Sequence, residues 1–192
     1  MRSHDLDTSD SWGWPARSFH WVIALMVLVQ FCFGLWMSEA PPRSERLFYY
    51  GIHASMGISI LALMVLRLVW RLANRVPVPA EPPGMPNWRK FAARIVHWLL
   101  YAVTFATVFA GWMLAGSHRT PVEIKMFGFI DMPQLVAAGS PLHSLLEEVQ
   151  EFLAFSLITL VVMHTAAALW HHFGRHDNVL TRMTSGGIRQ ET

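Results

Sequence analysis

The sequence predicts an all-α membrane protein, a bundle of four transmembrane helices with both termini on the cytoplasmic side. First, the 192-residue chain is 53% apolar and only 15% charged, whereas soluble domains are nearer to about 25% charged. Second, four windows of 20 to 24 residues contain no Asp, Glu, Lys or Arg, and about 20 apolar residues are enough for a helix to cross a hydrocarbon core. Third, most of the basic residues lie in segments that would face the same side of the membrane.

The four spans follow from the charge-free windows, and proline marks where they end. We expect a single membrane domain over residues 1–192, with spans at about 17–38, 47–72, 91–116 and 148–173. Pro41 and Pro42 follow the first span, and five prolines between residues 77 and 86 follow the second, because proline cannot continue a helix. The longest connection, about 119–147, contains glycine and proline and should fold as a lid on the outer face.

The distribution of Lys and Arg predicts the orientation of the bundle. Around the connection between the second and third spans, six basic residues face a single acidic one, Glu81. Between the third and fourth spans, Arg119 and Lys125 are outnumbered by five acidic residues. The basic connection should therefore be cytoplasmic, together with both termini. No basic run alternates with aromatic residues, so we exclude nucleic acid as a partner and expect membrane lipid around the spans.

The chain contains ten histidines, although ionisable side chains inside a bilayer are costly and tend to mark function. His20 and His97 lie at the inner ends of the first and third spans, and His53 lies at the outer end of the second. His164 lies midway down the fourth span, where an unpartnered imidazole would be expensive, so we interpret it as a metal ligand. His20 and His97 could instead be interface residues. Because a haem iron takes two axial imidazoles, a bundle of this size could hold haem.

The fourth span presents two positions on one helical face. Gln150 and His164 are 14 residues apart, which corresponds to about 21 Å along a helix and about 40° around it. This spacing predicts two ligand levels, one near each membrane surface, but the outer level holds glutamine. His143 precedes Gln150 by seven residues, about 10.5 Å farther out. His171 and His172, at the inner end, could be interface residues, neighbours of haem carboxylates or part of a quinone site.

Five segments, taken in order, resemble the bacterial cytochrome b561 family. They are SFHW at His20, IHASMGISILALMVLRLVWRL at His53, ARIVHWLLY at His97, FGFIDMP in the outer loop and MHTAAALWHHFGRHDNVLTRM at His164. The resemblance covers nearly the whole chain, and its most specific part is the last segment. It implies a four-helix, diheme b-type cytochrome of the inner membrane that exchanges electrons with quinone, some members oxidising superoxide at the outer face.

The resemblance also implies haem ligands. In the family pattern the inner haem is ligated from the first and fourth spans, which corresponds to His20 and His164. The outer haem is ligated from the second and fourth spans, which corresponds to His53 and the position of Gln150. Glutamine is not a usual haem ligand. The outer site therefore holds a five-coordinate haem on His53, recruits another ligand or is empty, and one or two haem b groups are implied. His143 could be that other ligand only if the outer loop folds down.

The depth of the inner pair leaves another alternative open. His20 lies three residues from Arg17, whereas His164 lies 11 residues from Arg175, a difference of about 12 Å if both arginines mark one plane. The fourth span could project past the membrane and restore a common level. Otherwise His171 would be the better partner for His20. We favour His164 because the family pattern does.

Two functions from different classes fit this sequence. The first is a membrane oxidoreductase that passes electrons from superoxide or a periplasmic redox protein to ubiquinone, with Arg17, Arg67 and Arg71 as candidate partners of haem carboxylates. Few basic residues lie on its outer face: Arg43, Arg46, Arg119 and Lys125. Electrostatic steering of an anion there would be local. The second is a haem-bearing anchor or relay that docks a partner protein on the outer loop and has no substrate site of its own. A homodimer is compatible with either function.

Overall fold

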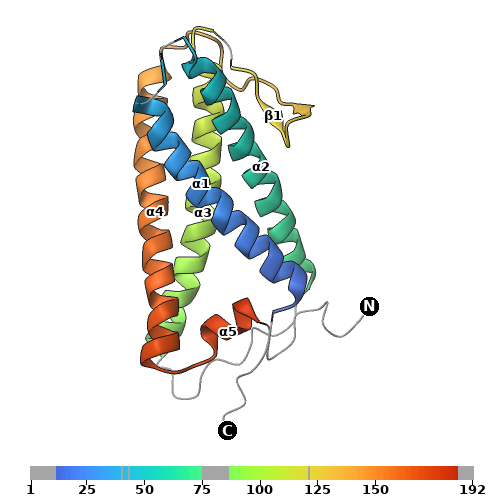
Figure 1. The fold of residues 1–192 in the computed structure, drawn as a ribbon, viewed down its shortest axis with the longest axis vertical. Helices are drawn as coiled ribbons and strands as arrows, with labels where there is room; N and C mark the ends of the chain where they lie inside the picture. Colours follow the sequence, from blue (N-terminus) through green and yellow to red (C-terminus); the bar gives the residue numbers. More distant parts are fainter. Residues whose placement is uncertain (1–11, 40, 43, 75–86, 121, 186–192) are drawn as a thin grey trace.

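The computed structural model describes residues 12–39, 41–42, 44–74, 87–120 and 122–185. Four long helices dominate it: α1 Trp14–Glu39, α2 Arg46–Ala73, α3 Asn87–Ser117 and α4 His143–Gly174. Each is long and apolar enough to cross a membrane, as the charge-free windows predict. α1 ends and α2 begins at the outer end of the bundle, at the top of Figure 1, and α4 ends at the inner end.

The helices pack in sequence order, α1 on α2, α2 on α3 and α3 on α4, whereas α1 and α4 approach each other at few places. One apolar cluster joins the first three helices through Ile23, Ile60, Met64 and Tyr101. α4 contributes only Leu146 and Leu157 to the buried residues of the described chain. The close-packed core therefore lies among α1, α2 and α3, and much of α4 has apolar side chains without a protein neighbour.

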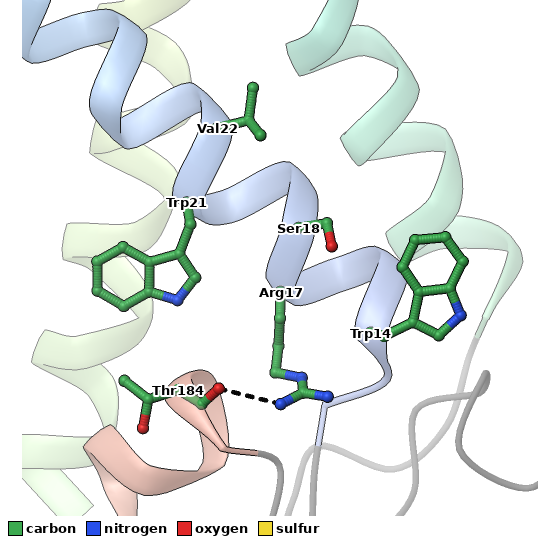
Figure 2. A pocket seen from close by; sticks show the side chains of 6 residues that line it. All are labelled: Trp14, Arg17, Ser18, Trp21, Val22 and Thr184. Atoms are coloured by element: carbon green, nitrogen blue, oxygen red, sulfur yellow. Dashed lines mark hydrogen bonds between the residues drawn. The ribbon is translucent and has the colours of Figure 1, made fainter.

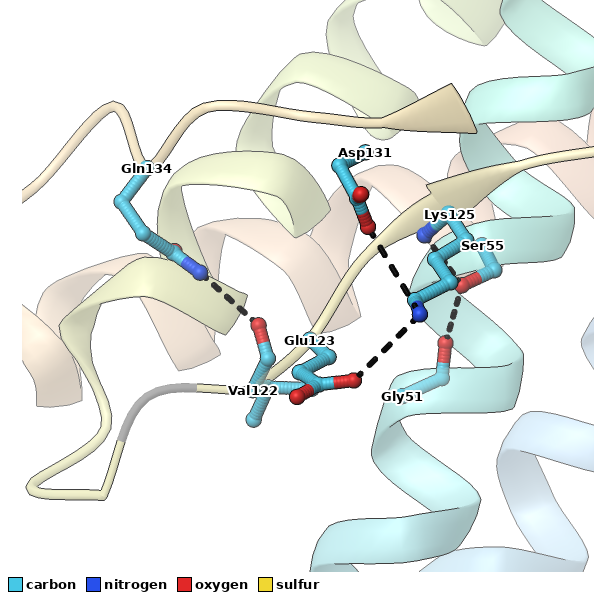
Figure 3. A network of polar contacts seen from close by, with 7 residues as sticks. All are labelled: Gly51, Ser55, Val122, Glu123, Lys125, Asp131 and Gln134. Atoms are coloured by element: carbon cyan, nitrogen blue, oxygen red, sulfur yellow. Dashed lines mark hydrogen bonds and ion pairs between the residues drawn. The ribbon is translucent and has the colours of Figure 1, made fainter. Parts of the chain in front are cut away.

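A small antiparallel hairpin, β1 Lys125–Met126 and β2 Ile130–Asp131, lies along α2 (Figures 1 and 3). The backbone N–H of Lys125 donates to Ser55 Oγ at 2.9 Å, and that of Phe127 donates to Ser59 Oγ at 2.8 Å. The turn places Phe127 at φ 53° and Gly128 at φ 83°, a conformation that glycine adopts easily and phenylalanine rarely. The expected lid is thus partly a hairpin on the flank of α2, and the rest crosses the outer end to reach α4.

At the inner end, the short helix α5, Val179–Thr184, turns back beneath α1 (Figure 1). The indole N–H of Trp21 donates to the Met183 carbonyl at 2.9 Å, and Arg17 donates to the Thr184 carbonyl at 3.1 Å. An open cavity of about 390 Å³ at this contact is lined by Trp14, Arg17, Ser18, Trp21, Val22 and Thr184, which Figure 2 shows. The last described segment of the chain is therefore attached to the first helix.

Candidate cofactor sites

Three histidines from three helices meet in the inner half of the bundle. The ring of His164 on α4 lies 6.2 Å from that of His20 on α1, centroid to centroid, with an interplanar angle of 81°. The ring of His97 on α3 lies 5.2 Å from that of His164 at 83°. The fold thus brings together residues 20, 97 and 164, which lie on three different helices and are far apart in the sequence.

The spacing of these rings distinguishes the two pairs. A metal–imidazole bond is about 2 Å long and the ring centroid lies about 1 Å beyond the nitrogen, so two imidazoles on opposite sides of one metal have centroids about 6 Å apart. The 6.2 Å between His20 and His164 matches this requirement, whereas the 5.2 Å between His97 and His164 is too short. The Nδ1 of His97 also contacts the Ala93 carbonyl at 2.6 Å, which holds the ring against its own helix. His20 and His164 are the pair that fits an axially ligated metal.

Two arginines of α2 lie at the same level. Arg67 is close enough to interact electrostatically with all three inner histidines. Its guanidinium lies 5.5 Å from the centre of the Tyr101 ring, and that of Arg71 lies 5.8 Å from the same ring. Arg71 also lies over Trp98 at 5.5 Å. Aromatic faces of α3 therefore position two permanent cations beside the histidines, where they can pair with carboxylates of a bound group.

The outer half of the bundle holds a different arrangement around His53. Its ring stacks on Phe33 at 6.1 Å, and a Cβ added at Gly34 would come within 3.1 Å of its Cε1. The side-chain amide of Gln30 donates to the His53 carbonyl at 2.7 Å. Glycine at position 34 thus leaves the space that the imidazole occupies beside α1.

Gln150 lies at the corresponding place beside α3. A Cβ added at Gly111 would come within 3.2 Å of its Nε2. Three buried polar atoms of this region have no hydrogen-bond partner: Gln30 Oε1, His53 Nδ1 and Gln150 Oε1. Buried polar atoms are normally paired, so three unpaired ones in the outer half of the bundle indicate a site for a polar or metal-containing group.

All four helices share the 14-residue spacing that the sequence showed on α4. Each carries one residue at the outer level and one at the inner level, about 21 Å and about 40° apart. The pairs, outer residue first, are Gly34 and His20, His53 and Arg67, Gly111 and His97, and Gln150 and His164. Sequence reasoning named Arg67 as one of several candidate partners of haem carboxylates and favoured helix packing for Gly34 and Gly111. The shared spacing is the signal that places all three at these two levels.

The outer-end histidines stay above the outer level. His143 is the first residue of α4, and its Nδ1 lies 2.7 Å from Ser117 Oγ. Its ring packs against that of His118 at 4.7 Å, and His118 stacks on Tyr50 at 5.2 Å. These contacts hold His143 at the junction of α3 and α4, so the structure does not bring it to His53.

His171 and His172 are not brought to His20 either. His171 Nδ1 lies 2.5 Å from Asp177 Oδ2, which Arg175 Nε also approaches at 3.8 Å. The ring of His172 packs against Phe173 at 4.7 Å. His171 therefore fixes the end of α4 to the segment that leads into α5, which is a structural role.

The donor set suits one kind of metal group. Within the described ranges, no three His, Cys, Asp or Glu side chains group so that they could hold a bare metal ion. Two facing imidazoles instead suit a metal whose equatorial positions are filled by a macrocycle, as in haem. Apolar helices around them, glycines that make room and arginines at the inner level are consistent with such a flat, carboxylate-bearing group.

Comparisons with known proteins agree with this chemistry. A family model described as prokaryotic cytochrome b561 matches residues 11–186. Cytochrome b561 homolog 2 of Escherichia coli (strain K12) is 31% identical over 92% of this chain and 93% of its own length. The protein named probable superoxide oxidase CybB of Yersinia pestis is 30% identical over 85% of this chain and 90% of its own length. Cytochrome b561 homolog 1 of Escherichia coli (strain K12) is 29% identical over 85% and 91%.

Proposed function

The chain belongs to the prokaryotic cytochrome b561 family, and from this premise we propose that it takes electrons from a donor at the outer face and delivers them to ubiquinone. The family consists of bacterial inner-membrane proteins that bind b-type haem and transfer electrons. The proposal goes beyond the family in naming the residues that hold the haem and the two redox partners.

The facing pair of His20 and His164 carries the proposal. Their ring centroids are 6.2 Å apart, on two helices that otherwise make little contact. We assign these two residues as the axial ligands at the inner level and His53 as a ligand at the outer level. Haem, when bound, supplies a one-electron couple between ferric and ferrous iron.

The remaining residues of the chain set the environment of that couple. Arg67 and Arg71 provide positive charge at the inner level, which stabilises carboxylates and favours the reduced state of a nearby redox group electrostatically. Apolar side chains of α1 to α4 exclude water. The levels lie about 21 Å apart along α4, one toward each surface, so a periplasmic donor would deliver electrons at the outer level and quinone in the bilayer would take them at the inner level.

Superoxide is the donor that we favour over a periplasmic redox protein, because a relative with 30% identity carries the name of a superoxide oxidase. The outer cations give only local attraction for an anion. Lys125 lies 3.7 Å from both Glu123 and Asp131, which neutralise it, and Arg43 lies outside the described residues. Arg46 and the exposed Arg119 remain. Replacing both with glutamine should slow superoxide-driven haem reduction several-fold at low salt and little at high salt; unchanged kinetics would favour the redox protein.

The ligand assignment is tested by counting haem. We expect His20→Ala and His164→Ala to lose the inner haem in a pyridine haemochrome assay, and added imidazole to restore its reduced-minus-oxidised spectrum. His172→Ala is the matched control, since it removes a histidine of α4 whose ring packs against Phe173. Full haem content in both inner variants would contradict the assignment. Ubiquinone reduction in proteoliposomes that contain the purified protein then tests the acceptor.

A further inference from the structure

The outer level differs from the inner level in having a single imidazole. His53 on α2 and Gln150 on α4 each lie seven residues inside the outer end of their helix, about 10.5 Å deep. The next histidine toward the outer end of α4, His143, is held at Ser117 by a 2.7 Å contact. Of the residues that the structure describes at this level, His53 therefore offers the one nitrogen ligand typical of haem.

Gln150 places a carboxamide at the outer level whose hydrogen-bonding capacity is not fully used. Its Oε1 is buried and has no hydrogen-bond partner, and its Nε2 lies where a Cβ at Gly111 would come within 3.2 Å. A carboxamide is a weak ligand for haem iron but both a donor and an acceptor of hydrogen bonds. Its chemistry therefore suits contact with a small polar ligand better than coordination of the metal.

Glycines on α1 and α3 leave room for His53 and Gln150 at the outer level. Gly34 lies against His53, and Gly111 lies against Gln150. At the inner level, the equivalent positions on α1 and α3 hold His20 and His97. At the outer level, glycines thus take the places that His20 and His97 hold at the inner level. The amide of Gln150 takes the place of the His164 imidazole.

We propose that the outer level binds haem through His53 alone, and that the side facing α4 is a site for a small diatomic ligand that accepts a hydrogen bond from Gln150. The inference rests on the proposed function only in that the bundle holds haem, and it is independent of the electron donor and acceptor. It gives this chain a ligand-binding position that a bis-imidazole haem lacks.

Carbon monoxide is the probe, applied to the dithionite-reduced, purified full chain. We expect two haems per chain, one of which gives a CO difference spectrum. His53→Ala should abolish the CO-reactive haem and retain the inner one, with its unchanged α-band as the internal standard. Gln150→His supplies a second imidazole and should keep both haems but lose CO binding. Gln150→Leu should keep CO binding and weaken it about three- to tenfold, the effect of one lost hydrogen bond.

Three results would overturn this inference. Two haems without CO binding would mean that a sixth ligand fills the outer site. A single haem that is insensitive to His53→Ala would mean that the outer level binds none. Unchanged CO binding in Gln150→His would place the open position elsewhere. In each case, quinone reduction through the inner haem could persist, whereas a preparation without any haem would refute the proposed function itself. Because Gln150→His does not depend on His53→Ala, a folding failure of one variant leaves the other informative.

Discussion

The contact between Gly34 and His53 makes a single methyl group a probe of the outer site. In Gly34→Ala, the new Cβ would lie 3.1 Å from His53 Cε1, whereas ordinary van der Waals contact begins at 3.4 Å. The ring would have to move by about 0.3 Å, against Phe33 on which it stacks. Neither neighbour is the free end of a flexible side chain, so the strain cannot be relieved cheaply.

The structure also provides a graded series of comparisons. A Cβ at Gly111 would meet the flexible amide end of Gln150 at 3.2 Å, and one at Gly57 would meet Gln30 Nε2 at an ordinary 3.5 Å. Overpacking a tight site costs about 1–3 kcal/mol, or about 5- to 150-fold in an equilibrium constant. We expect Gly34→Ala to fall in this range, Gly111→Ala near its lower end and Gly57→Ala below it.

Haem retention is the assay. Each variant is purified in the same detergent, and haem per chain is measured after dialysis against apomyoglobin, which captures released haem. Gly34→Ala should lose outer haem and retain inner haem. The decisive comparison is with Gly57→Ala, whose added Cβ would make only an ordinary 3.5 Å contact with Gln30 Nε2 and which should retain the outer haem. A loss of outer haem in Gly34→Ala no greater than that in Gly57→Ala would refute the reasoning.

Other predictions concern stability. Ser59→Ala removes the acceptor of the Phe127 amide and should destabilise the hairpin by about 1–3 kcal/mol, measured by faster hydrogen exchange at that amide. Burial and the nearby His143 lower the pKa of His118 below its ordinary 6.5, so its neutral form is favoured in the folded state. Stability should be full above about pH 6.5 and decrease as the pH falls through that value; His118→Gln should flatten this decrease in thermal midpoints. Tyr101→Phe should cost little because its hydroxyl has no partner, whereas Tyr101→Leu removes the ring beneath Arg67 and should lower the thermal midpoint.

The four-helix fold could be predicted from the sequence because charge is so expensive in a bilayer that its absence over 20 residues identifies a span. The absence of charge, however, predicts which residues lie in the hydrocarbon core and does not predict where a helix begins or ends. α4 begins at His143, before Glu147, Glu148 and Glu151, because charged residues are tolerated in a helix that extends beyond the hydrocarbon core. The hairpin could not be predicted, since strands of two residues leave no alternation to detect.

The candidate site was predictable in part. His20 and His164 lie together in the structure, although their distances from Arg17 and Arg175 differ, because helix tilt and the extension of α4 are set by packing and not by local sequence. Their binding of haem stays a prediction. Arg67 could not be separated from the arginines that merely mark the inner side, since only the fold shows which cation faces the histidines.

The hairpin on α2 has a consequence for the order in which the bundle assembles. Ser59 lies 13 residues from the start of α2, about 20 Å along it, so the hairpin shields backbone and serine hydroxyls far down that flank from acyl chains. Val122 and Ile124 pack against both Ile58 of α2 and Ala115 of α3. A segment that leaves the ribosome after both helices thus bridges them, and it can dock only once they are inserted side by side. Docking of this segment therefore stabilises the pairing of α2 with α3 once both helices are in place.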